Sequence, residues 1–173
     1  MKKFLAIILA LVMVLPTFVS AAPYKTYTYA KSGEILISPD AYEPDLYVDS
    51  EYIGLDEEMP FDDPSDLFVG PDEKGYIADT ANNRILVLTR YYKLDFEITS
   101  FVNDYGVPDT FSNPKGVFVN EKNIYGCDTD NNRLVLFDTD GNFIKIIEQP
   151  ESSLFEEGAI YKPIACAVDQ FGR

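Results

Sequence analysis

The sequence predicts an all-β fold in which four-stranded antiparallel sheets are repeated along the chain. Short segments rich in Tyr, Phe and aliphatic residues alternate with polar turns, as strands and hairpin turns do. Helical periodicity never extends beyond about two turns. The body also repeats itself, because Pro64, Pro114 and Pro163 open successive similar units at spacings of 50 and 49 residues.

Each complete unit has the pattern of four short strands. In the first unit we expect strands at residues 67–69, 76–78, 84–89 and 94–101. In the second unit we expect strands at residues 117–119, 124–127, 134–137 and 143–147. The third strand of the first unit is apolar on both faces, which is typical of a sheet packed between two others. Repeated sheets of this kind predict the blades of a β-propeller.

A turn motif occurs once in each complete unit. Residues 79–85 are Asp-Thr-Ala-Asn-Asn-Arg-Ile, and residues 128–134 are Asp-Thr-Asp-Asn-Asn-Arg-Leu. Both resemble the signature of the NHL repeat, and residues 114–119 resemble the strand that opens such a repeat. The resemblance covers residues 63–173, with departures at Ser65-Asp66 and Gly126-Cys127. It implies a propeller of about six blades, of which this chain carries about two and a fraction.

The predicted organisation has five segments. They are a signal peptide (1–22), a lead-in of N-terminal strands (23–62), two NHL-type blades (63–112 and 113–161) and the start of a third blade (162–173). Within the lead-in, residues 26–29 alternate like a strand and residues 46–48 resemble another, and we expect at least one of them to close the ring by pairing with the last blade. Because the sequence stops one strand into the third unit, we expect an N-terminal fragment whose ring does not close.

The N-terminus has the three parts of a secretory leader. Lys2 and Lys3 precede an apolar run over residues 4–15, and small residues follow at 20–22. A run of this length is short of the ~20 residues that span a bilayer, and no later segment is long and apolar enough to do so. We therefore expect a secreted or extracytoplasmic cell-surface protein. Exported bacterial proteins that resemble this chain can carry a membrane domain after the propeller.

The charge and the absence of His exclude several classes of function. Without the leader the chain has 12 basic and 29 acidic residues, a net charge of −17, which repels phosphate backbones and predicts no nucleic-acid partner. The chain has no His, the commonest general base and metal ligand. Residues 128–132 resemble the start of a calcium loop, but Arg133 and Thr139 stand where Gly and Glu are required. We expect no catalytic residue, metal or cofactor in this chain.

The repeated turn motif is predicted to be structural. Recurrence favours this role, because a catalytic residue is needed once in a protein and not once in each blade. We expect the Asp and Thr side chains to bond turn backbone groups locally, the Asn residues to adopt left-handed conformations, and the Arg residues to pair with a nearby carboxylate. The motif residues are Asp79, Thr80, Asn82, Asn83, Arg84, Asp128, Thr129, Asn131, Asn132 and Arg133.

Two further features lie in or between the repeats. Cys127 and Cys166 are in predicted strands of neighbouring units, where export would permit a disulfide, although two buried free thiols are the simpler interpretation. Residues 105–111 connect the two units. We expect Phe111 to fill the gap between them, with a ligand-binding loop as the alternative.

The leading functional hypothesis is a non-enzymatic binding or scaffold module for a peptide, glycan or protein partner, because a propeller offers a rigid rim and a funnel lined by loops. The alternative is a fragment of a metal-dependent lactonase-like hydrolase or of a lyase. The resemblance allows both, since NHL-type and related propellers include ligand-binding scaffolds, receptor sensors and such enzymes. In the enzyme the catalytic residues would lie in blades that this sequence does not contain.

Export is directly testable. We expect cleavage after Ala21 or Ala22, because small residues occupy the recognition positions there. Sequencing the N-terminus of the protein purified from outside the cell checks this expectation. An N-terminus at Met1 on that extracellular protein would contradict it.

Overall fold

The computed structural model describes residues 27–37, 46–153, 155–156 and 158–169. The predicted leader and its cleavage point lie outside these residues. The chain divides into two compact units, Met1–Tyr47 and Val48–Arg173. In the first, strand β1 (Tyr27–Tyr29) pairs with strand β2 (Ile35–Ile37) in an antiparallel hairpin. β1 matches the expected strand over its described residues, but its partner β2 is not predicted by the sequence analysis.

The second unit begins with a short helix instead of the strand expected at residues 46–48. Helix α2 (Ser50–Ile53) starts after Asp49, whose side chain accepts a hydrogen bond from the backbone N–H of Tyr52 at 2.7 Å. Gly54, at φ 91°, ends it. The strand expectation was wrong, since residues 46–48 have no regular secondary structure. No helix among the described residues is long and apolar enough to cross a membrane.

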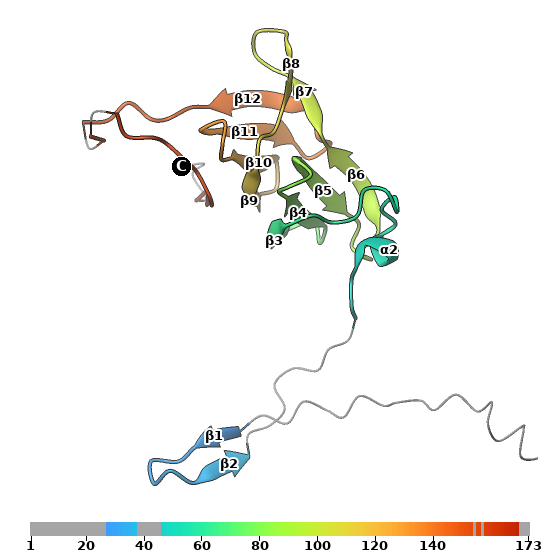
Figure 1. Cartoon of the computed structure of the whole chain (residues 1–173), viewed down its shortest axis with the longest axis vertical. Coiled ribbons are helices and arrows are strands. Elements are labelled where there is room, and N and C mark those ends of the chain that lie inside the picture. The colour runs from blue at the N-terminus through green and yellow to red at the C-terminus, as the bar shows by residue number, and fades with distance from the viewer. Residues whose placement is uncertain (1–26, 38–45, 154, 157, 170–173) are drawn as a thin grey trace, which may run out of the picture. The chain divides into compact units, whose positions relative to one another are not determined.

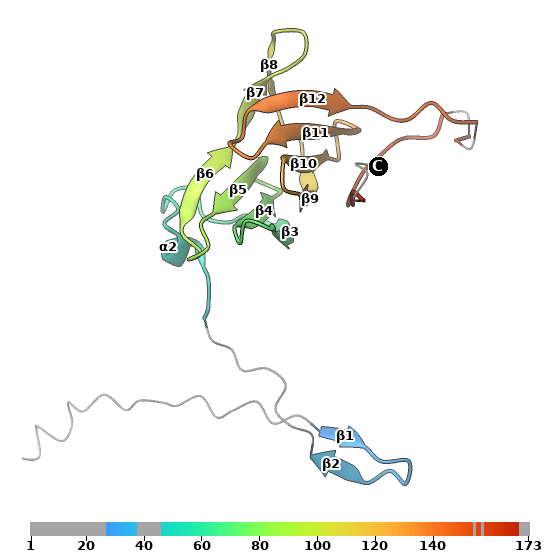
Figure 2. The ribbon, with the colours of Figure 1, turned by 180° about the vertical axis from the view of Figure 1, so that it is seen from behind.

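Two four-stranded antiparallel sheets form the body of this unit, which confirms the all-β class. The first contains, in spatial order, β3 (Pro64–Val69), β4 (Gly75–Asp79), β5 (Arg84–Leu88) and β6 (Leu94–Ile98). The second contains β9 (Pro114–Val119), β10 (Asn123–Asp128), β11 (Arg133–Asp138) and β12 (Phe143–Ile147). Figures 1 and 2 show the two sheets packed next to each other, with β9 close to β3 and β4.

A separate hairpin connects the two sheets. Its strands are β7 (Ser100–Val102) and β8 (Pro108–Thr110), and it projects beyond the sheets in Figure 1. The single strand expected at 94–101 is therefore divided after Ile98. Ile98 and Phe101 are both buried although they are three residues apart, so the two-residue alternation of one strand cannot serve both.

Residues 163–169, where the first strand of a third unit was expected, form no strand in the structure. In both four-stranded sheets the first strand pairs as a strand only with the second strand of the same sheet. No such partner lies beside residues 163–169 in the described part of the chain.

The core between the sheets is rich in phenylalanine. The Phe101 ring stacks on Phe143 at 5.2 Å and meets Phe111 edge-on at 5.7 Å, and Phe111 is 3% exposed. Phe111 thus fills the space between the two units, as expected. A Cβ atom at Gly126 would lie 2.8 Å from Cδ1 of Ile85 and 3.1 Å from Phe111. Glycine at this position therefore makes the close packing possible.

The outer face of the first sheet is covered by the lead-in. Ile53 joins Ile77, Leu86 and Leu88 in a second buried cluster, with Phe61 packed against it. Phe61 precedes the first sheet as Phe111 precedes the second. The lead-in of residues 48–62 therefore contributes apolar side chains to the first sheet, much as the connecting segment does for the second.

Replacing Phe111 with Ala tests this core. We expect Phe111→Ala to lower the free energy of unfolding by about 3–5 kcal/mol, because it leaves a cavity between the sheets. Tyr105→Ala, in the exposed turn of the adjoining hairpin, is the control and should change it by less than about 0.5 kcal/mol. Urea denaturation followed by circular dichroism measures both. Equal effects of the two substitutions would contradict this assignment of the core.

Candidate functional site

The first copy of the repeated motif forms a buried polar cluster where β4 turns into β5. The Asp79 side chain is fully buried. Its Oδ1 atom accepts a hydrogen bond from the backbone N–H of Asp62 at 2.8 Å. Its Oδ2 atom accepts hydrogen bonds from Nε of Arg84 at 2.7 Å and from Nδ2 of Asn82 at 2.9 Å. One carboxylate therefore holds both the turn and the segment that precedes the sheet.

The second copy repeats these bonds. Asp128, also fully buried, accepts from the backbone N–H of Ser112 at 2.7 Å. It also accepts from Nε of Arg133 at 2.7 Å and from Nδ2 of Asn131 at 2.9 Å. The structure thus brings the predicted motif residues together in two equivalent clusters. The bonds to Asp62 and Ser112 are additional, since the sequence analysis expected only local contacts.

The arginines extend each cluster to the preceding segment. The Arg84 guanidinium donates to the carbonyl of Met59 at 2.9 Å and to the carboxylate of Glu97 at 3.0 Å. Arg133 makes a bidentate ion pair with Asp109 at 2.8 and 2.9 Å. Bidentate pairs of this kind fix geometry as well as charge. Each Arg therefore pairs with two carboxylates, one inside its motif and one outside it.

The second Asn of each motif adopts the left-handed conformation that the sequence suggests. Asn83 has φ 54° and Asn132 has φ 56°. In addition, the Asn83 side-chain oxygen accepts a hydrogen bond from the backbone N–H of Asn113 at 2.8 Å. This bond links the turn of the first unit to the start of the second.

The threonines also bond between units, in addition to the local role that was expected. Thr80 Oγ1 donates to the carbonyl of Pro114 at 2.7 Å, and Thr129 Oγ1 donates to the carbonyl of Pro163 at 2.7 Å. Each bond spans 34 residues, and both threonines are buried. The signal that could have predicted them is the repeated 34-residue spacing from the motif Thr to the next opening Pro.

The Asp109–Arg133 pair dominates the electrostatics of the second cluster. The hydrogen bond from Arg133 lowers the pKa of Asp109 from 3.8 to about 2, with a smaller contribution from the Asn103 side chain. The same hydrogen bond raises the pKa of Arg133. Both groups are therefore charged in the native protein over the whole range from mildly acidic to neutral pH.

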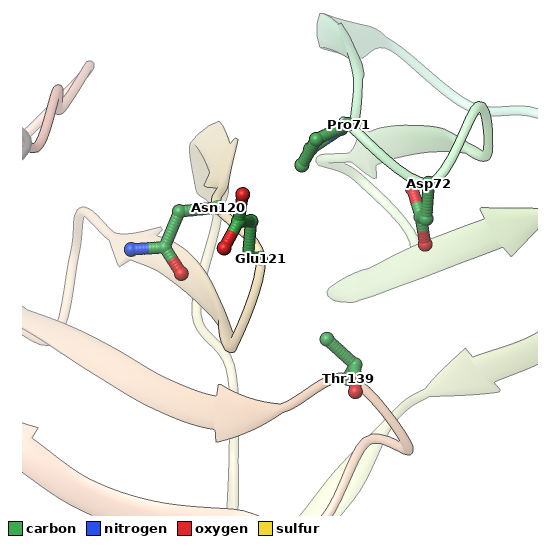
Figure 3. Close-up of a pocket in the computed structure, with 5 residues that line it drawn as sticks. All are labelled: Pro71, Asp72, Asn120, Glu121 and Thr139. Atoms are coloured by element: carbon green, nitrogen blue, oxygen red, sulfur yellow. The ribbon is translucent and has the colours of Figure 1, made fainter.

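A pocket of about 230 Å³ lies where turns of the two sheets meet (Figure 3). The turn between β3 and β4 contributes Pro71 and Asp72, the turn between β9 and β10 contributes Asn120 and Glu121, and Thr139 follows β11. Its lining offers carboxylate, amide and hydroxyl groups, which suit hydrogen-bond donors. No motif residue lines it, and turn residues of ordinary composition gave no sequence signal for it.

One wall of the pocket is held by Tyr76. Its hydroxyl donates to Oδ2 of Asp72 at 2.8 Å. Burial, reinforced by this hydrogen bond, raises the pKa of Tyr76, so the hydroxyl stays protonated and the bond persists at physiological pH. The Asp72 carboxylate is therefore positioned by a neutral donor from the core.

Both cysteines are free thiols in the structure, and the described residues contain no group of three or more His, Cys, Asp or Glu arranged to hold a metal ion. No protein-family model matches the chain, and a search of the curated proteins gives no match.

The Asp109–Arg133 pair predicts a defined acid dependence of stability. The folded-state pKa of Asp109 is about 2 and its usual value is 3.8, so its stabilising effect is present above about pH 4 and is lost as the pH falls towards 2. We expect Asp109→Asn to destabilise the protein at pH 7. The difference from the wild type should shrink as the pH approaches 2.

Urea denaturation of both proteins between pH 2 and 7 measures this difference. Asp140→Asn, in an exposed turn, is the matched control and should behave as the wild type at each pH. A gap between Asp109→Asn and the wild type that stays constant with pH would contradict the assignment.

Proposed function

We propose that residues 63–161 are two neighbouring blades of an NHL-type β-propeller, exported to act as a non-enzymatic binding or scaffold module. The partner would be a peptide, glycan or protein. The observation that carries the proposal is the repeated junction. Thr80 reaches Pro114 and Thr129 reaches Pro163 through the same atoms, over the same 34 residues and at the same distance.

Packing of the sheets supports the blade interpretation. The first strands, β3 and β9, lie side by side, and the rings of Phe68 and Phe118 meet across them at 4.9 Å. The two middle strands, β4 and β5, are buried over their whole length, so the centre of the first sheet is covered on both faces. Sheets that bury both faces and repeat one junction suit a ring of blades, which removes long open edges.

The burial of the motif supports a scaffold role. Asp79, Asp128 and Arg84 are almost wholly inaccessible and are bonded within the chain. Side chains in this position hold blades together and do not reach a ligand. Recognition then falls to exposed turns, where propellers and other rigid folds commonly bind their partners.

We assign the binding surface to the end of the sheets that carries the pocket of Figure 3. Antiparallel pairing places the turn between β5 and β6 at this same end of the first sheet. That turn exposes Tyr91 and Tyr92, which are 70% and 45% accessible. Tyr92 has φ 57°, whereas Gly141 has φ 83° in the corresponding turn of the second sheet. A left-handed aromatic residue costs on the order of 1 kcal/mol, and such strain is typical of functional turns.

The net charge favours some partners over others. The mature chain carries 29 acidic and 12 basic residues, which attracts basic peptides and permits neutral glycans. The same charge opposes binding of nucleic acid.

Screening the exported chain against a glycan array and a displayed peptide library tests the proposal. We expect a ligand that binds saturably in isothermal titration calorimetry and is recovered unchanged by mass spectrometry after prolonged incubation. Tyr91→Ala should weaken binding about tenfold or more, because exposed aromatic residues commonly anchor interfaces.

Two matched variants sharpen the test. Tyr105→Ala removes a tyrosine of the β7–β8 hairpin that is even more exposed than Tyr91 and should leave the affinity unchanged. Arg133→Ala should lower the melting temperature and leave the affinity unchanged at temperatures where the protein is folded. Chemical conversion of the bound ligand would refute the binding-module proposal and favour the hydrolase or lyase alternative.

A further inference from the structure

Two cysteines lie at the junction between the second sheet and the segment of residues 161–169. Cys127, on β10, is fully buried, and Cys166 is half-buried. They are 39 residues apart in the sequence. Neither has a role in the repeated polar clusters or in the pocket, so the proposed function does not use them.

Backbone packing brings the two thiols together. A Cβ atom placed on Gly116 would lie 2.5 Å from the carbonyl oxygen of Ile164, 3.0 Å from Cα of Ala165 and 3.1 Å from Sγ of Cys127. The segment therefore packs against β9 at Gly116, close to Cys127, and Cys166 is the next residue along. The two thiols are close enough to shift each other's pKa.

The internal repeat places buried residues at the same two positions of the first junction. Ala78 and Val117 hold the equivalent places at the first junction, and both are buried. The first junction also has a hydrogen bond from the backbone N–H of Val117 to Oδ2 of Asp66 at 2.9 Å. Gly116 stands in the place of Asp66 in the second unit and has no side chain to make such a bond.

We propose that Cys127 and Cys166 form a disulfide that locks residues 161–169 onto the second sheet when the protein meets a thiol-oxidising environment. This disulfide lock takes the place of the hydrogen bond between Asp66 and Val117, which has no counterpart at the second junction. The proposal rests on the packing of the junction and is independent of the ligand-binding proposal.

The oxidant is a disulfide, either a small-molecule one or that of an oxidoreductase. The hydrogen bond between the thiols lowers the pKa of Cys166 and, with burial, raises that of Cys127. Cys166 is thus the thiolate that attacks the oxidant, forming a mixed disulfide and releasing one thiol. Cys127 then loses its proton and attacks Sγ of Cys166, releasing the second thiol. Two protein thiols are oxidised, and one disulfide is reduced to two thiols.

Two ionisable groups surround the pair. Asp66 lies close enough to disfavour a thiolate at either cysteine. Burial, followed by proximity to both cysteines, raises the pKa of Tyr161. Burial and Asp66 oppose the thiolate at Cys166, but the interaction with Cys127 outweighs them, so the pKa of Cys166 is lowered overall. Tyr161 is neutral near pH 7 and does not oppose the thiolate.

The experiment oxidises the purified full chain with glutathione disulfide, blocks free thiols with N-ethylmaleimide and maps the peptides under non-reducing conditions. We expect both thiols to become unreactive together in a monomeric protein, with a linked peptide pair containing Cys127 and Cys166. The melting temperature should rise by about 10 °C and fall again with dithiothreitol, because a closed loop of this length restricts the unfolded chain.

Variants separate the lock from other effects. Cys127→Ala and Cys166→Ala should each abolish the redox dependence of the melting temperature. In a Cys127→Ala, Cys166→Val background, Ala78→Cys with Val117→Cys should restore a disulfide at the first junction. Thiols that stay reactive in the oxidised wild type, or that link different chains, would overturn the proposal whether or not the variants fold.

Discussion

A fully buried aspartate at the end of the second strand is the constraint on which each sheet depends. A buried carboxylate costs several kcal/mol unless it is paired and hydrogen-bonded. Asp79 and Asp128 meet this cost with an Arg, an Asn and a backbone N–H each. The backbone N–H comes from the segment before the sheet, so the sheet and its preceding segment must form together. This requirement explains why the lead-in of residues 48–62 belongs to the second compact unit.

The same clusters set the spacing from one unit to the next. The threonine that follows each buried aspartate donates a hydrogen bond to the opening proline of the next unit. Once the turn of one unit has formed, it therefore positions the start of the next unit. The two junctions differ in the side chains that lie beside this bond. Ala78 and Val117 pack at the first junction, and two thiols face each other at the second. The junction therefore keeps the threonine bond and varies the contacts beside it, as interfaces between repeats commonly do.

Most of the two sheets could be predicted from the sequence, because the alternation of apolar and polar residues and the internal repeat can both be read directly from it. The two four-stranded sheets, the left-handed Asn83 and Asn132, and the buried Phe111 all follow from them. The β7–β8 hairpin and helix α2 were missed because three-residue strands and a four-residue helix carry almost no periodicity. The inter-unit bonds of the threonines and the lining of the pocket depend on contacts between distant segments. Only the repeated 34-residue spacing pointed to the threonine bonds, and no local pattern indicated the lining of the pocket.

The division between buried motif and exposed turn also determines where the two units can diverge in function. The turn between β5 and β6 carries Tyr91 and a left-handed Tyr92, whereas the turn between β11 and β12 carries Asp140 and Gly141. Both turns connect the same kind of strands on the same framework, so a change there leaves the buried clusters intact. Aromatic side chains held by a rigid sheet lose little entropy on binding, and they lie at the end of the sheets that carries the acidic pocket. A framework fixed by buried charge can thus carry different exposed side chains on each unit without altering the junctions that hold the units together.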